Sequence, residues 1–66
     1  MRVLVNGEPR DLPDGLTVAS LLDGLGVARD GTAVERNEAV VPRGQQDEVL
    51  LAEGDRIEIV TFVGGG

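Results

Sequence analysis

The chain contains no cysteine, histidine, lysine, tyrosine or tryptophan. Without cysteine it cannot form a disulfide, and without cysteine and histidine it lacks the usual ligands of a structural zinc ion. The absent residue types also supply most general bases, nucleophiles and Schiff-base amines of enzymes. The 66 residues suffice for one small domain, whose core has to hold by packing alone. We therefore expect a protein that is not an enzyme by itself.

Basic residues are scarce as well. Six arginines stand against twelve aspartates and glutamates, and the formal net charge is −6. Nucleic acids and anionic lipids are bound mainly by clustered lysine and arginine, so we expect neither a nucleic-acid partner nor a membrane partner. A basic surface on a partner protein would complement this charge, although the charge also serves solubility alone.

Long apolar runs are missing too. The first run ends at Asn6-Gly7, well short of the roughly 7–15 apolar residues in the core of a signal peptide. No segment approaches the ~20 apolar residues of a membrane-spanning helix. We expect a cytoplasmic protein, and in the absence of a coiled-coil pattern we expect it to be monomeric on its own.

The first twelve residues are predicted to form a β-hairpin. Apolar and other side chains alternate from Met1 to Val5, as is typical of a strand. Asn6-Gly7 favours a type I′ turn, because both central residues of that turn need positive φ. The returning strand, 8–12, contains Pro9, which cannot donate a ladder hydrogen bond. This second strand is therefore expected at an edge of the sheet.

The pattern over 17–25 predicts a helix. Thr17 is a good N-cap, and Gly26 fits the left-handed conformation that often ends a helix. The apolar side chains recur at helical spacing and indicate one buried face. They are Val18, Leu21, Leu22 and Leu25.

The second half of the chain is expected to supply the remaining strands. Alternation predicts strands over 32–36 and 56–62, with a short extended piece over 40–41. We also expect one helical turn over 45–48 and a short strand over 49–51. This element order is that of the α+β class called the β-grasp (ubiquitin-like) fold. There, a mixed four- to five-stranded sheet wraps one helix, and the terminal strands pair in parallel.

The last residues differ in kind from the rest. We expect residues 1–63 to form the β-grasp domain and residues 64–66 to form a flexible glycine tail that carries the C-terminal carboxylate. A frayed terminus is the simpler alternative. A tail without side chains can thread into a narrow active site. Its carboxylate, with a pKa of about 3.3–3.7, is ionised and therefore a poor electrophile until an enzyme activates it.

Four stretches carry a family resemblance: 34–37, 41–43, 54–60 and 62–66. On these the whole chain resembles the ThiS-type sulfur carriers of thiamine biosynthesis. The resemblance implies that an E1-like adenylyltransferase of the ThiF type consumes ATP to adenylate the Gly66 carboxylate. A cysteine desulfurase or another sulfur donor then supplies sulfur for a thiocarboxylate, which serves thiazole synthase of the ThiG type. Gly64 and Gly65 would thread into the partner active sites, and the carrier itself would bind no cofactor and no metal.

A partner-facing apolar patch is predicted next to the tail. Val60 and Phe62 alternate with the side chains that should face the helix, and Leu4 joins them if the terminal strands pair. Exposed apolar clusters often mark partner sites. Isolated exposed apolar residues, by contrast, are normal on any surface.

Three other functions share many of these features. The small subunit of molybdopterin synthase has the same fold and the same kind of terminus and differs in the acceptor enzyme. A ubiquitin-like modifier would use the same adenylate but end in an isopeptide bond on target lysines. A non-covalent β-grasp interaction module would need no reactive terminus at all.

Overall fold

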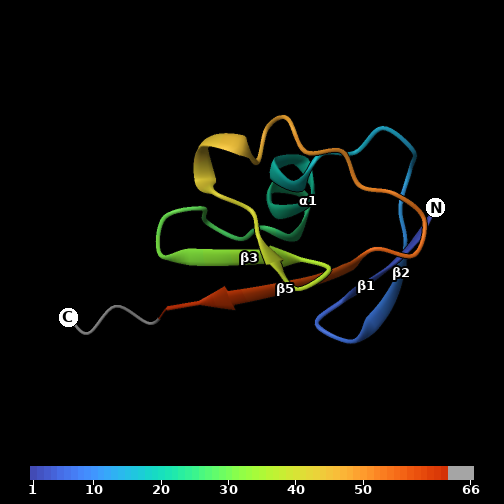
Figure 1. Cartoon of the computed structure of the whole chain (residues 1–66), viewed down its shortest axis with the longest axis horizontal. Helices are drawn as coiled ribbons and strands as arrows, with labels where there is room; N and C mark the ends of the chain where they lie inside the picture. The colour runs from blue at the N-terminus through green and yellow to red at the C-terminus, as the bar shows by residue number, and fades with distance from the viewer. Residues whose placement is uncertain (63–66) are drawn as a thin grey trace.

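The computed structural model describes residues 1–62, in which a mixed five-stranded sheet packs one face against a single helix (Figure 1). The strand order is β2-β1-β5-β3-β4. The first and last strands pair in parallel and the other neighbours pair antiparallel, which is the β-grasp arrangement expected from the sequence. The elements are β1 (Arg2–Val5), β2 (Glu8–Asp11), α1 (Val18–Leu25), β3 (Thr32–Arg36), β4 (Ala39–Val40), the 3₁₀ turn η1 (Arg43–Gln45) and β5 (Arg56–Thr61).

The β1–β2 hairpin forms as predicted. Asn6 and Gly7 both have positive φ, 51° and 82°, as a type I′ turn requires. β2 has only β1 beside it and forms one edge of the sheet. Pro9, which has no N–H, is thereby accommodated without loss of a ladder hydrogen bond.

Helix α1 has the two caps that the sequence predicts. The Thr17 hydroxyl accepts a hydrogen bond from the Ser20 amide at 3.1 Å, and Gly26 ends the helix at φ 71°. The Val27 amide donates to the Leu22 carbonyl at 3.0 Å, which completes a Schellman-type end. The helical face made by its buried side chains lies against the sheet.

The segment between β4 and β5 contains the helical turn predicted over 45–48, because the Gln45 carbonyl accepts from the Glu48 amide at 2.9 Å and the Val49 amide at 3.1 Å. Directly before it lies η1 at 43–45, which the sequence did not predict and whose first hydrogen bond is accepted by the Pro42 carbonyl. The strand predicted over 49–51 is wrong. Its backbone pairs with the residues around the start of α1, through Val18 N–H to the Val49 carbonyl at 3.0 Å and Leu51 N–H to the Leu16 carbonyl at 2.9 Å.

The core lies between the helix and the middle strands. Ile57 is completely buried and Ile59 is half-buried, so β5 presents both side chains toward α1 as predicted. The buried apolar cluster comprises Val3, Val5, Val18, Leu21, Leu22, Val34, Val41, Leu51 and Ile57. Within residues 1–62, no helix combines the length and apolar character needed to cross a membrane. The predicted division between 1–63 and 64–66 falls on residues outside the described part.

Candidate functional site

The candidate site lies at the end of β5, the strand that leads to the terminal glycines. β5 pairs with β3 over five residues, from Ile57 opposite Arg36 to Thr61 opposite Thr32. The last hydrogen bond of this edge joins the Phe62 amide to the Gly31 carbonyl at 2.7 Å. The chain is thus held against β3 up to Phe62. The predicted functional residues Gly64, Gly65 and Gly66 lie outside the described residues.

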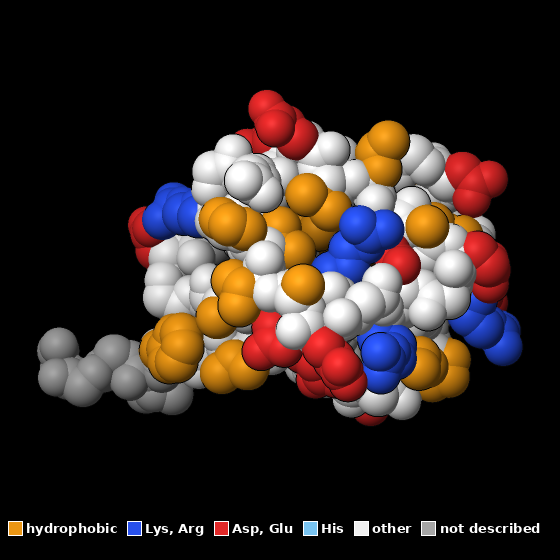
Figure 2. Space-filling view, viewed as in Figure 1, with side chains coloured by type: hydrophobic (Ala, Val, Ile, Leu, Met, Phe, Trp, Pro, Cys, Tyr) orange, Lys and Arg blue, Asp and Glu red, His pale blue; other side chains and the backbone are white. Residues whose placement is uncertain are grey.

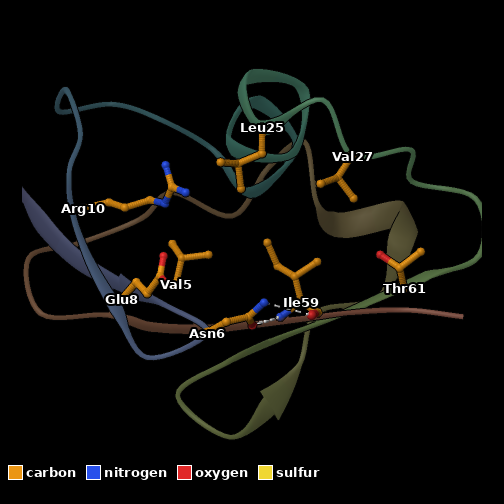
Figure 3. A pocket seen from close by; sticks show the side chains of 8 residues that line it. All are labelled: Val5, Asn6, Glu8, Arg10, Leu25, Val27, Ile59 and Thr61. Atoms are coloured by element: carbon orange, nitrogen blue, oxygen red, sulfur yellow. Dashed lines mark hydrogen bonds between the residues drawn. The ribbon is translucent and has the colours of Figure 1, made fainter.

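Asn6 extends the grip of β1 on β5. The backbone register between the two strands spans only Leu4 opposite Arg56 and Val5 opposite Ile57. One step further, the Asn6 side chain takes the place of a strand neighbour. Its Oδ1 accepts from the Ile59 amide at 2.7 Å, and its Nδ2 donates to the Ile59 carbonyl at 3.2 Å (Figure 3). The hairpin turn therefore also fixes the middle of β5.

Asp55 anchors the start of β5. This residue is only 5% exposed, and its carboxylate accepts three hydrogen bonds. The donors are Arg36 Nε at 2.8 Å, Asn37 Nδ2 at 3.0 Å and the Ala52 amide at 2.8 Å. The network ties the beginning of β5 to the β3–β4 turn and to the loop before β5.

The pKa of Asp55 reflects a competition between burial and hydrogen bonding. Burial raises the pKa, because it disfavours the charged carboxylate. The donors from Asn37 and Ala52 lower it, and Arg36 lowers it further through a hydrogen bond and its charge. The lowering contributions together prevail, so the pKa of Asp55 lies below its ordinary value. Asp55 is therefore ionised in the folded protein near neutral pH.

The three residues of the predicted apolar patch all lie on the face of the sheet opposite α1. Leu4 is 36% exposed, Val60 52% and Phe62 62%. β1 and β5 do pair, but the register places Leu4 beside Arg56, four residues before Val60. Four strand residues span about 13 Å, so Leu4 lies apart from the other two. Of these three residues, only Val60 and Phe62 are neighbours on this face. Their contact with a partner stays a prediction.

Acidic side chains share this outer face. Glu35 and Glu58 are directly opposite each other in the β3–β5 register, and neither takes part in an ion pair within residues 1–62. Like charges in such a cross-strand pair repel each other. Val40, 69% exposed, is the next neighbour of Glu35 on β4. Figure 2 shows acidic and hydrophobic side chains interspersed on one side of the molecule.

The described residues offer no obvious metal site. Across 1–62, no group of three or more acidic side chains is arranged to hold a metal ion. The arrangement instead suits presentation of the chain that follows β5. Asp55 fixes the start of β5, Asn6 fixes its middle, and pairing with β3 fixes its end. The strand delivers the chain to the edge of the molecule (Figure 1).

Two residues of interest escaped the sequence reasoning. Asp55 reads as an ordinary turn residue after Gly54, and the only available signal was an acidic residue directly before a strongly alternating strand. Arg10 reads as one more charge on an edge strand. That it has no carboxylate partner among residues 1–62 emerges only from the positions of the acidic residues in space.

Comparison with known proteins gives consistent matches over the whole chain. The model of the ThiS family matches residues 3–66. The sulfur carrier protein ThiS of Escherichia coli K12 is 32% identical over 66 residues, which cover 100% of both chains. The crystal structure of a thiamine biosynthesis protein (ThiS) from Geobacter metallireducens superposes with a TM-score of 0.86 at 36% identity, again over 100% of both chains.

A longer relative is also similar. A thiazole synthase of Magnetococcus marinus is 52% identical over 66 residues, which are 100% of this chain but 20% of that protein. The chain thus spans a fifth of the length of the thiazole synthases that it matches.

Proposed function

The chain belongs to the ThiS family, and from this membership we propose that it is a sulfur carrier protein of thiamine biosynthesis whose reactive group is the carboxylate of Gly66. One observation carries the proposal. The family match runs through residue 66 and so includes the three glycines that follow the domain. The E. coli sulfur carrier protein ThiS matches from end to end, which supports the same role for the same segment.

The proposed chemistry has three steps. A Gly66 carboxylate oxygen attacks the α-phosphorus of ATP on an E1-like enzyme of the ThiF type, and pyrophosphate leaves. A persulfide sulfur, supplied by a cysteine desulfurase or another donor, attacks the carbonyl carbon of the acyl adenylate, and AMP leaves. A thiol then reduces the acyl disulfide, so that a thiocarboxylate and a new disulfide result. The ATP belongs to the partner enzyme, and the carrier contributes the carboxylate.

The chain offers few groups that would intercept its own activated terminus. It has no lysine and no cysteine, so the amine of Met1 is its one strong nitrogen nucleophile. That amine donates to the Leu12 carbonyl at 2.7 Å and lies 3.5 Å from an oxygen of Asp14. The arrangement favours transfer of the activated carbonyl to an external sulfur.

Thiazole synthase of the ThiG type is the proposed acceptor. The support comes from the thiazole synthase of M. marinus, where a stretch similar to this whole chain makes up 20% of the protein. A carrier-like segment within a thiazole synthase indicates that the two act together. We propose that this chain delivers its sulfur to such an enzyme.

We further propose that Val60 and Phe62 contact the partner enzymes, and that a basic partner group approaches the neighbouring Glu35–Glu58 pair. The repulsion within that pair would be relieved by a cation, and the net charge of −6 favours a basic surface. Changing Phe62 to Asp is expected to weaken the complex with the activating enzyme without unfolding the domain, because Phe62 is 62% exposed. Leu50→Asp, at an apolar residue that is similarly exposed (57%) but pairs with Thr17 beside the helix, is the control. Loss of the cooperative unfolding transition in the Phe62 variant would place this residue in the core and contradict the idea.

The deciding experiment is the intact mass of the protein, ending at Gly66, after incubation with ATP, the E1-like enzyme and a sulfur donor. We expect a mass shift equal to the replacement of one oxygen by sulfur, and we expect the shift to vanish when Gly66 is removed. An adenylate that never gains sulfur would point instead to a covalent modifier. No change, with the enzyme proved active on another carrier, would leave a non-covalent interaction module.

A further inference from the structure

An open groove lies on the helix side of the sheet, beyond the end of α1. Residues of β1, β2, β5 and the end of α1 enclose it, and its volume is ≈ 400 Å³ (Figure 3). We call it the β2–α1 groove, because β2 forms one of its ends and the end of α1 its roof (Figure 3).

The middle of the β2–α1 groove is apolar. Val5 and Ile59 form its floor on the sheet, while Leu25 and Val27 reach toward them from the end of the helix (Figure 3). Val5 is buried and the other three are half-buried, so they retain apolar surface toward the groove. This volume is within the roughly 300–1,000 Å³ of typical ligand sites and exceeds the needs of one aliphatic side chain.

The end of the groove at β2 is charged. Arg10 and Glu8 alternate with Pro9 on the strand and both side chains line the groove. The other five arginines each have a carboxylate oxygen within 3.7 Å, but Arg10 has none among residues 1–62. In a chain with twice as many acids as arginines, an arginine left without an acidic partner beside an apolar surface is complementary to an external carboxylate.

The free edge of β2 is poorly suited to pairing with an added strand from a partner. Across the hairpin, the Met1 amine donates to the Leu12 carbonyl and the Leu12 amide donates to the Met1 carbonyl. Because backbone groups alternate in direction along a strand, those of Arg10 also point toward β1, whereas those of Pro9 and Asp11 point away from it. Pro9 has no N–H to offer, which interrupts the row that an added strand would need. Recognition at this edge therefore has to use side chains.

We propose that the β2–α1 groove is a docking site for a segment of a partner protein that presents a leucine-like side chain beside a single carboxylate. The apolar side chain covers Ile59, Leu25 and Val27, and the carboxylate bonds to the Arg10 guanidinium. Glu8 limits the site to one carboxylate, because a second one would lie beside the Glu8 side chain and the two negative charges would repel each other. This docking involves neither the terminal glycines nor the outer face of the sheet, so it stands apart from the sulfur-carrier function.

The test is a titration of the ¹⁵N-labelled protein with the peptide N-acetyl-Leu-Leu-Asp-amide, followed by amide chemical shifts. We expect saturable shifts at Leu25, Val27 and Ile59 with a dissociation constant below about 10 mM. The matched peptide with asparagine in place of aspartate is expected to bind roughly fivefold more weakly. A peptide with lysine at that position is expected to bind no better than the asparagine peptide.

Variants of the protein complete the test. Arg10→Glu and Arg10→Gln are expected to weaken binding of the aspartate peptide roughly fivefold or more, while Glu8→Gln leaves it unchanged or tightens it. Arg43→Glu is the matched control, because this exposed arginine lies outside the groove and the variant changes the net charge equally. Spectra of the free variants report whether the fold is retained.

Three results would overturn the proposal. They are no shifts at the groove amides up to about 10 mM peptide, equal affinity for the aspartate and asparagine peptides, and equal weakening by Arg43→Glu and Arg10→Glu. Tighter binding of the lysine peptide would assign the charged end to Glu8 instead and would contradict the proposed occupant.

Discussion

Replacement of Asp55 by asparagine tests the anchor at the start of β5 with a change of nearly equal size. In the protein, Oδ2 of Asp55 accepts from both Arg36 Nε and the Ala52 amide, at 2.8 Å each. Oδ1 accepts from Asn37 Nδ2 at 3.0 Å. Three donors therefore converge on a group that has no hydrogen to donate when it is ionised.

An asparagine at this position cannot satisfy all three donors. If its oxygen takes the place of Oδ2, its NH₂ group faces the NH₂ group of Asn37. Asn37 cannot turn its amide to compensate, because its own Oδ1 accepts from the Arg56 amide at 2.9 Å. In the opposite orientation, the new NH₂ group faces the donors from Arg36 and Ala52. At least one donor–donor contact thus remains in either orientation, one with Asn37 in the first and two in the second.

The expected loss in the free energy of unfolding follows from these contacts. A hydrogen bond to a charged group contributes about 1.5–3 kcal/mol, and breaking a buried ion pair costs about 3–5 kcal/mol. The Arg36 side chain is 34% exposed, so solvent screens part of its interaction with Asp55. We therefore expect Asp55→Asn to lower the free energy of unfolding by about 2–3 kcal/mol, a large share of the ~3–5 kcal/mol that a core of this size supplies.

The effect should depend on pH in a defined direction. Because the pKa of Asp55 is lowered by folding, its stabilising contribution is complete above the pKa of the unfolded chain, about 3.9. The contribution is lost as the pH falls through the lower pKa of the folded state. The difference between the protein and Asp55→Asn should thus be constant near pH 7 and shrink below about pH 4.

Urea unfolding followed by far-ultraviolet circular dichroism is the appropriate assay, since the chain has no tryptophan or tyrosine for fluorescence. Asp47→Asn is the matched control, because it removes the same charge from an exposed pair with Arg29 and should change the free energy of unfolding by less than about 0.5 kcal/mol. A loss for Asp55→Asn no larger than that of the control, or a loss that persists unchanged at low pH, would refute the reasoning.

Three further substitutions test other parts of the fold. Gly24→Ala should raise the free energy of unfolding by about 0.5–1 kcal/mol, because Gly24 lies within α1 and an added Cβ would meet no atom within 4 Å. Gly26→Ala should lower the free energy of unfolding, because Gly26 has a φ of 71°, which residues with a side chain rarely adopt. Gln46→Met should raise it by up to about 1 kcal/mol. Gln46 is 2% exposed, its Oε1 has no hydrogen-bond partner in the described part of the chain, and its Nε2 makes only a long bond of 3.5 Å to the Val41 carbonyl. A decrease would indicate that this bond, or one to a buried water, outweighs the unpaired oxygen. Asn6→Gly keeps positive φ available but removes both side-chain bonds to Ile59, so hydrogen exchange of the Ile59 amide should accelerate more than that of Val34; equal acceleration would mean global destabilisation instead.

The elements that the sequence predicts well are those with local physical signals. The Asn6-Gly7 turn depends on the positive φ of two neighbours, and α1 depends on Thr17 and Gly26 at its ends. Each signal lies within a few residues of its effect. The parallel pairing of β1 and β5 has no local signal and followed from element order together with the apolar character of both strands.

The failures concern partners that are distant in sequence. Leu50 and its neighbours look like a strand, yet Val49 and Leu51 pair with backbone around the start of α1, more than thirty residues away. The place of Leu4 on the outer face was predictable from alternation, whereas its distance from Val60 depends on the strand register. A shift of register changes every neighbour of a strand, and only the three-dimensional arrangement fixes it.

Contacts from distant parts of the chain also determine how β5 presents the segment that follows it. Asp55, Asn6 and Gly31 hold β5 at its start, its middle and its end, and all three act on β5 from outside the glycine segment. The direction in which the chain leaves the sheet is therefore set by the domain and does not need the residues beyond Phe62. A partner that docks on the sheet would meet the chain at Phe62 at a fixed offset from its contacts. If the proposed function holds, loosening β5 through Asn6→Gly should slow the proposed sulfur loading on the activating enzyme while Gly66 itself remains unchanged, which separates presentation of the terminus from its chemistry.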